Sequence, residues 1–322
     1  MGARRLAGAT SAARLILAGS ALLDSHDALM ADDERRYRAA ITAAFPNLSL
    51  RTCRFLAEGW DSIVWEVNGD LVFRFPKRAE VATRLRIEIA LLPVLGPTLP
   101  VPTPRFAYVA DGADMDPFPV VGYPKLPGVP LVDMPAAAIA PERLAAQIGQ
   151  FLTALHRFPT DCAVTSGVPD SNPETWRAHY ATMRAALVPL FPRMTPPERA
   201  QTEALFAAYL DDAAHFRFAP VLLHRDLGGD HFLLDPHTGD LAAVIDWGDV
   251  SIGDPAQDFC GLPAVWLPAL LAAYGGAVDA TFADRVAFYR SLGPYHMLDF
   301  GLLHGGGERF IEQGLAELRG SP

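Results

Sequence analysis

The 322-residue sequence predicts an α+β fold with two lobes. Strand-like segments gather in the first third of the chain, whereas amphipathic helical segments dominate from residue 141 onward. Half of the residues are hydrophobic, which is enough for a substantial core. We therefore expect a small β-rich N-terminal lobe at 31–122 and a larger, mostly helical C-terminal lobe at 123–322. Residues 1–30 form an extension of unknown role.

Composition excludes several classes of protein. The net charge of −10 argues against a nucleic-acid partner, whose binding surface is normally basic. The three cysteines are widely spaced and form no CxxC pair, so neither a disulfide framework nor a zinc site is indicated. No apolar run approaches the roughly 20 residues of a membrane span. We expect no membrane partner.

The N-terminal lobe is predicted from one helix and a run of strands. Tyr37, Ile41 and Phe45 recur every fourth residue and predict a helix over 31–45. Asn68-Gly69 is a strong hairpin signal between two apolar runs. The strands expected in this region are 51–56, 63–67, 71–75, 106–110 and 118–123.

One arginine of the third strand is predicted to face away from the core. Alternation along the strand places Phe73 and Phe75 on one face and Arg74 on the other. Lys77 lies beyond Pro76, which should end the strand. Arg74 is therefore the first candidate for a charged role here, and Lys77 is the alternative.

The remaining segments are mostly helical. A helix at 80–95 carries Glu88 in its interior, and the Pro- and Gly-containing loop at 124–128 is expected to be the hinge between the lobes. Further helices are expected at 141–158, 176–190, 197–218, 266–274, 282–292 and 300–318.

The segment 221–259 is the most informative part of the chain. Asp226 follows a short apolar strand, and His231 leads into a second strand at 232–234. Proline and glycine within 235–240 predict a turn. The strand that returns from this turn delivers Asp246 beside the first loop.

Two carboxylates in this arrangement suit phosphoryl transfer. Asp226 is placed to accept a hydrogen bond from a substrate hydroxyl, and Asp246 offers the oxygen ligand that Mg²⁺ prefers. Each aspartate alone has an alternative reading as a turn residue or helix cap. The pair together, followed by 253–255 and Asp258-Phe259, favours a catalytic site.

These motifs resemble the aminoglycoside phosphotransferase superfamily. Its pattern is His-Gly-Asp, an Asn five residues after the Asp, and then Ile-Asp-Trp or Ile-Asp-Phe, which the chain matches at His224, Asp226 and 245–247. Segments 57–62 and 72–76 are similar to the nucleotide loop and third strand of the aminoglycoside 2″-phosphotransferase branch. The resemblance covers roughly residues 50–259 and implies a two-lobed protein-kinase-like fold.

The resemblance also implies a set of roles. It implies transfer of the γ-phosphate of ATP or GTP, with Mg²⁺, by a cytoplasmic enzyme. Asp226 becomes the catalytic residue, and His231 and Asp246 become the metal ligands. The nucleotide-binding residues become Gly59, Ser62, Arg74 paired with Glu88, and Tyr123 and Lys125 at the hinge.

Departures from the family pattern leave the acceptor open. Arg225 replaces the usual glycine, and His231 replaces the Asn, as it also does in the 2″ and macrolide branches. Aminoglycoside 2″-kinases carry acidic residues shortly after the Asp-Phe, where this chain has the apolar run 261–268. The candidate substrate residues are Asp258, Trp266 and Asp299.

Three functions remain in view. We expect an antibiotic-resistance type kinase acting on a hydroxyl of an aminoglycoside-like small molecule. A kinase for a macrolide or another less cationic molecule is the alternative. The alternative from another class is a nucleotide-binding pseudokinase with a regulatory role, suggested by the replacement of the usual Lys and Asn with Arg74 and His231. The choice between ATP and GTP, the phosphorylated hydroxyl and the oligomeric state stay open.

Overall fold

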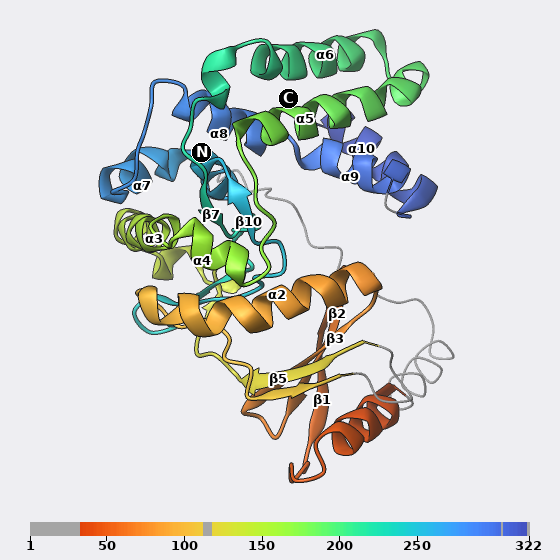
Figure 1. Ribbon diagram of the computed structural model, residues 1–322, viewed down its shortest axis with the longest axis vertical. Coiled ribbons are helices and arrows are strands. Elements are labelled where there is room, and N and C mark those ends of the chain that lie inside the picture. Colours follow the sequence, from red (N-terminus) through yellow and green to blue (C-terminus); the bar gives the residue numbers. More distant parts are fainter. Residues whose placement is uncertain (1–32, 112–117, 304, 321–322) are drawn as a thin grey trace. The chain divides into compact units, whose positions relative to one another are not determined.

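The computed structural model describes residues 33–111, 118–303 and 305–320. The chain forms two compact units. The first holds the residues up to Arg78 together with Ala107–Tyr123, and the second holds Ala79–Phe106 and the chain from Pro124 onward. A β-rich first unit and a largely helical second unit confirm the predicted two-lobed α+β fold (Figure 1). The predicted extension at 1–30 lies outside the described residues.

The first unit is a five-stranded sheet in the order β1-β2-β3-β5-β4. A helix at 33–44 packs on it, with Tyr37 and Ile41 in one cluster with the buried rings of Trp65, Phe73 and Phe75. The predicted core positions on the third strand are thus confirmed. The strands are β1 (Cys53–Glu58), β2 (Ser62–Val67), β3 (Leu71–Pro76), β4 (Tyr108–Ala110) and β5 (Val120–Pro124).

The turn between β2 and β3 has the predicted chemistry. Asn68 and Gly69 take positive φ angles of 58° and 86°, which a two-residue hairpin turn of this type requires. The Asn68 side chain also accepts a hydrogen bond from the backbone N of Arg51 at 2.8 Å, so the turn is tied to the segment before β1.

Helix α2 (Ala79–Leu95) belongs to the second unit, although sequence alone assigns it to the N-terminal lobe. Its last turns bury Leu91, Leu92 and Leu95 in the large apolar cluster of that unit. Because these leucines pack in the core of the second unit, the helix belongs with that unit. The lobe boundaries of 31–122 and 123–322 otherwise remain a prediction.

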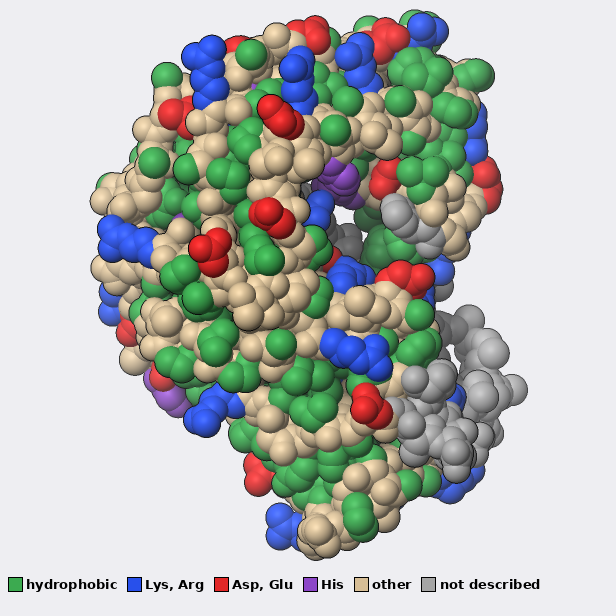
Figure 2. Space-filling model, viewed as in Figure 1, with side chains coloured by type: hydrophobic (Ala, Val, Ile, Leu, Met, Phe, Trp, Pro, Cys, Tyr) green, Lys and Arg blue, Asp and Glu red, His purple; other side chains and the backbone are tan. Residues whose placement is uncertain are grey.

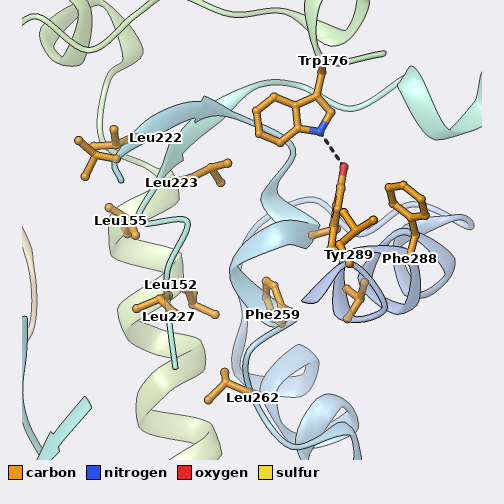
Figure 3. Packing of buried hydrophobic residues seen from close by; sticks show 14 of the residues in the cluster. Leu152, Leu155, Trp176, Leu222, Leu223, Leu227, Phe259, Leu262, Phe288 and Tyr289 are labelled. Atoms are coloured by element: carbon orange, nitrogen blue, oxygen red, sulfur yellow. Dashed lines mark hydrogen bonds between the residues drawn. The ribbon is translucent and has the colours of Figure 1, made fainter. Parts of the chain in front are cut away.

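The core of the second unit surrounds helix α3 (Pro141–His156). Leu152 and Leu155 of α3 belong to the same apolar cluster as Leu222 of β7 (Figure 3). In the same cluster, Trp176 Nε1 donates a hydrogen bond to the hydroxyl of Tyr289 at 2.8 Å (Figure 3). The other helices are α4 (Thr160–Thr165), α5 (Pro173–Leu187), α6 (Pro196–Leu210), α7 (Leu267–Ala273), α8 (Phe282–Arg290), α9 (Gly293–Leu303) and α10 (Gly307–Gly320).

The single helix expected at 300–318 is wrong, because the chain breaks there into α9 and α10. Gly305 and Gly307 take positive φ angles of 82° and 66°. Only glycine adopts such angles readily, so the glycine run ends one helix and starts another. No helix among the described residues is both long and apolar enough to cross a membrane.

Short strands build the frame of the central motif. Strands β8 (Phe232–Leu234) and β9 (Leu241–Val244) pair antiparallel, which confirms the predicted hairpin. Strand β7 (Val221–Leu223) pairs with β10 (Ser251–Gly253), and β6 (Val129–Pro130) extends the hairpin. Sequence reasoning did not anticipate β6, β10 or α4, since each is very short.

Candidate active site

The ends of β7, β8 and β9 bring the three principal predicted residues together. His231 Nδ1 lies 3.5 Å from Asp226 Oδ2, and His231 Nε2 lies 3.7 Å from Asp246 Oδ2. The same Nε2 lies 3.6 Å from a fourth residue, Asp230. His231 therefore sits between the two aspartates. Its Nδ1 also lies 2.5 Å from the backbone carbonyl of Asp226, so that nitrogen donates and Nε2 faces the other two carboxylates.

Two residues of the site adopt a left-handed backbone. Arg225 has φ 72° and Asp246 has φ 62°, which side chains other than glycine rarely adopt. Asp258 holds the first of these turns in place, because its carboxylate accepts hydrogen bonds from the backbone N of Arg225 at 2.7 Å and of His224 at 3.0 Å. Such strained positions occur where the surrounding structure over-determines them.

His224 joins the two motifs as a neutral, buried residue. Its Nε2 donates to the carbonyl of Ile245 at 3.0 Å, and its ring packs on Trp247 with centroids 4.6 Å apart. Burial, which outweighs the attraction of nearby carboxylates, lowers the pKa of His224 to about 4. This bond fixes the loop of Asp226 against the strand end that carries Asp246.

Asp258 is a correction to the sequence prediction. It was expected to contact substrate, but its side chain is wholly buried and its oxygens already accept hydrogen bonds. Besides the two backbone donors, His156 Nε2 lies 3.1 Å from it, and His156 Nδ1 lies 2.7 Å from the hydroxyl of Tyr274. Asp258 and His156 therefore support the loop that carries Asp226. Sequence alone gives His156 no functional role, because its partners are more than 100 residues distant.

Electrostatics of the cluster favour a cation between the carboxylates. Burial among neighbouring protein atoms, together with Asp249, Asp246 and Asp230, raises the pKa of Asp226 to about 6, although 56% of its side chain is exposed. Burial would lower the pKa of His231, but the surrounding aspartates outweigh it and raise that pKa. These carboxylates repel one another and attract a cation.

The residues present fit a Mg²⁺ ion that keeps other ligands. Among the described residues, no group of three or more His, Cys, Asp and Glu side chains is arranged to enclose a metal. Mg²⁺ usually takes one or two carboxylates and completes its shell with phosphates and water. Asp246 would supply such a carboxylate, with His231 and Asp226 beside it.

Helix α2 brings two further residues to the Asp246 turn. A Cβ atom at Gly248 would lie 3.6 Å from both Asp246 Oδ1 and Glu88 Oε1, so the buried Glu88 reaches the turn that carries Asp246. One turn earlier on α2, Arg84 forms a short ion pair with Asp249. Arg84 and Asp249 carry no motif signal and emerge only from the structure.

The predicted nucleotide residues lie mostly in the first unit. Gly59 N bonds to the carbonyl of Ser62 at 3.0 Å, which closes the loop between β1 and β2. Arg74 is buried on β3, whereas Lys77 Nζ bonds to Glu58 at 2.5 Å and to the carbonyl of Gly59 at 2.7 Å. The Lys77 ammonium group is thus occupied by the loop between β1 and β2, which supports Arg74 as the phosphate-binding candidate.

The two hinge candidates differ in exposure. Tyr123 is buried at the end of the first unit, and Lys125 is exposed at the start of the second. The predicted pairing of Arg74 with Glu88 joins residues of different units and stays a prediction.

Of the remaining substrate candidates, Trp266 lies half-buried against the large apolar cluster. Asp299 lies on α9 and acts electrostatically on His179 of α5. Burial and Arg225 lower the pKa of His179, and Asp299 opposes this shift only in part. Arg225 itself lies over the ring of Trp176, 5.7 Å from its centroid. Sequence reasoning did not single out His179 or Trp176.

Comparison with known proteins agrees with this geometry. Residues 52–294 match the model of the phosphotransferase enzyme family. Over 196 residues the chain is 32% identical to viomycin phosphotransferase of Streptomyces vinaceus, a match covering 59% of this chain and 65% of that protein. The chain thus matches somewhat less than two thirds of that relative's length.

Solved structures give the same answer. The GDP and kanamycin complex of APH(2″)-IIia superimposes with a TM-score of 0.78 at 30% identity, covering 88% of this chain and 97% of that one. A macrolide 2′-phosphotransferase type I superimposes with a TM-score of 0.72 at 25% identity, covering 88% and 96%. The predicted resemblance and the kinase-like fold are confirmed, and the chain belongs to the phosphotransferase enzyme family.

Proposed function

We propose that this protein transfers the γ-phosphate of ATP or GTP to a hydroxyl group of a small molecule. The observation that carries the proposal is the placement of Asp226 and Asp246 on adjacent loop ends, with His231 between them at 3.5 and 3.7 Å. Phosphoryl transfer depends on positioning and charge neutralisation, and this cluster is built for both.

In this proposal each carboxylate has one task. Asp226 accepts a hydrogen bond from the acceptor hydroxyl and directs its oxygen toward the γ-phosphorus. Asp246, with His231 beside it, would hold Mg²⁺, which supplies neutralisation of the charge on the phosphate oxygens. Arg74 would bind phosphate oxygens through its guanidinium, a role that arginine can fill bidentately.

Two acceptor classes are proposed. The aminoglycoside class is supported by the likeness to a kinase solved with kanamycin and to a viomycin phosphotransferase. A macrolide or another less cationic acceptor is favoured by the apolar run at 261–268, where Val265 is 83% exposed, and by the burial of Asp258. A likeness to a macrolide phosphotransferase also supports this second class.

The test is transfer of labelled γ-phosphate from ATP and from GTP to a panel of aminoglycosides, viomycin and macrolides. Asp226→Asn should lower kcat by about 10²–10⁴-fold, the usual contribution of a positioned acid–base group, and leave nucleotide binding intact. The matched control is Asp284→Asn, which removes an exposed carboxylate on α8 and should leave kcat unchanged. An Asp226→Asn protein with full activity, or no shift in melting temperature with either nucleotide, would contradict the proposal.

A further inference from the structure

Arg225 occupies a backbone conformation that its side chain makes costly. Its φ is 72°, a conformation that is sterically unfavourable for a residue with a Cβ atom and that glycine adopts freely. The strain is held by the hydrogen bond from Arg225 N to Asp258 at 2.7 Å. Arg225 directly precedes Asp226, so a strained arginine stands next to the proposed catalytic residue. Backbone strain at such a place indicates a role for the side chain.

The guanidinium of Arg225 keeps its positive charge unneutralised. It lies over the ring of Trp176, at 5.7 Å from the centroid, which orients it toward the start of α5. Within residues 33–111, 118–303 and 305–320, no carboxylate forms an ion pair with it. The contact with Trp176 fixes the direction of the charge but does not cancel it.

Helices α5 and α9, which pack side by side, complete the surroundings of this charge. They contribute His179 and His296, whose side chains are exposed. Figure 2 shows histidine, in purple, at the surface of the helical part of the molecule. Crowding by neighbouring protein atoms and the charge of Arg225 lower the pKa of both, although both side chains are exposed, so both imidazoles are mostly neutral at pH 7. Asp299 is the carboxylate that acts on His179. The face therefore combines the cation of Arg225 and two neutral rings with two carboxylates, Asp299 and Asp249, and Asp249 is already paired with Arg84.

We propose that Arg225 is a specificity-determining residue that selects against polycationic acceptors and admits weakly cationic or neutral ones. The proposal rests on the proposed function, because it concerns the acceptor of the same site. An ammonium group brought toward Asp226 from the α5–α9 side meets the guanidinium, and like charges at close range are a common means of excluding a wrong partner. Asp258, which sequence alone assigns to the substrate, is buried and offers no carboxylate to an ammonium group.

The test is direct binding of kanamycin, a polycation, by titration calorimetry without nucleotide. Arg225→Gly removes the charge and relieves the strain, so the Kd for kanamycin should fall roughly five- to tenfold, the size of a partly exposed like-charge contact. This gain in affinity should shrink in 0.5 M salt, because the Debye length is then only about 4 Å and the repulsion is screened. The Kd for a macrolide should stay within about twofold, since it lacks the repelled charges.

The matched control is Arg217→Gly, an exposed arginine whose φ is −107°. It removes the same charge from the same unit without relieving strain, and it should leave the Kd for kanamycin unchanged. The melting temperature of Arg225→Gly should not fall, because glycine adopts this backbone freely. A purely structural role for Arg225 would instead lower the melting temperature and leave the Kd unaltered.

The proposal would be overturned if the wild type and Arg225→Gly bound kanamycin equally, or if neither bound it. An equal gain in affinity in Arg217→Gly would overturn it as well. Because the titration needs neither nucleotide nor transfer, its failure is separate from failure of the proposed function, which the labelled-phosphate assay detects.

Discussion

The buried carboxylate of Asp258 is the sharpest structural prediction. Asp258→Ala removes the acceptor of two backbone N–H bonds, from His224 at 3.0 Å and Arg225 at 2.7 Å. It also removes the partner of His156 Nε2 at 3.1 Å. Each buried donor left without a partner costs about 1–3 kcal/mol, so the substitution should lower the free energy of unfolding by about 3–5 kcal/mol.

At about 2–4 °C per kcal/mol, the melting temperature should fall by about 6–20 °C. Because the bond to Arg225 holds the turn before Asp226, activity at a temperature where the variant is folded should fall as well. A misplacement of about 1 Å at the reacting group is enough for a loss of about 10²-fold in kcat. Asp258→Asn, which keeps one acceptor oxygen, should lie between the wild type and Asp258→Ala in both measurements.

The assay pairs circular-dichroism melting with γ-phosphate transfer by the folded fraction. Asp284→Ala on α8 is the matched control, since it removes an exposed carboxylate. A melting temperature of Asp258→Ala within about 2 °C of the wild type, together with unchanged kcat, would refute the reasoning that this carboxylate holds the catalytic loop.

Two further predictions concern stability. The folded-state pKa of Asp226 is raised to about 6 from 3.8, so the folded protein binds this proton more tightly; stability falls as the pH rises from 3.8 to about 6 and stays lowered above that pH. Asp226→Asn should therefore melt higher than the wild type at pH 7.5, and the gain should vanish below about pH 4; a gain that persists there would contradict this origin. Gly261→Ala places a Cβ atom 1.9 Å from the carbonyl oxygen of Leu227 and should destabilise the protein by about 3 kcal/mol or more, whereas at Gly248 the nearest atoms lie at 3.6 Å and alanine should cost less than about 1 kcal/mol. Equal melting temperatures for the two alanine variants would show that the loop yields without cost.

Much of the site could be predicted because it is local in sequence. His231 and Asp246 flank one hairpin and Asp226 lies five residues before His231, so turn chemistry and strand alternation suffice to bring them together. The third strand illustrates the same point, because alternation alone places Phe73 and Phe75 in the core.

Other parts could not be predicted, because their signals are weak or distant. The helix break between α9 and α10 depends on glycines whose φ angles only the packed structure reveals. The pairing of Arg84 with Asp249 joins residues 165 positions apart and leaves no periodic pattern.

The sequence by itself determined the reaction class, since the carboxylates of phosphoryl transfer occur at fixed spacings within one supersecondary unit. Only the tertiary structure decided the role of Asp258, which sequence alone assigns to the substrate. The packing of α3 against the catalytic loop buries this residue beneath the backbone of His224 and Arg225. Whether a side chain is buried depends on the packing of the whole unit. The same aspartate in the same local sequence can face a substrate or support the loop that does so.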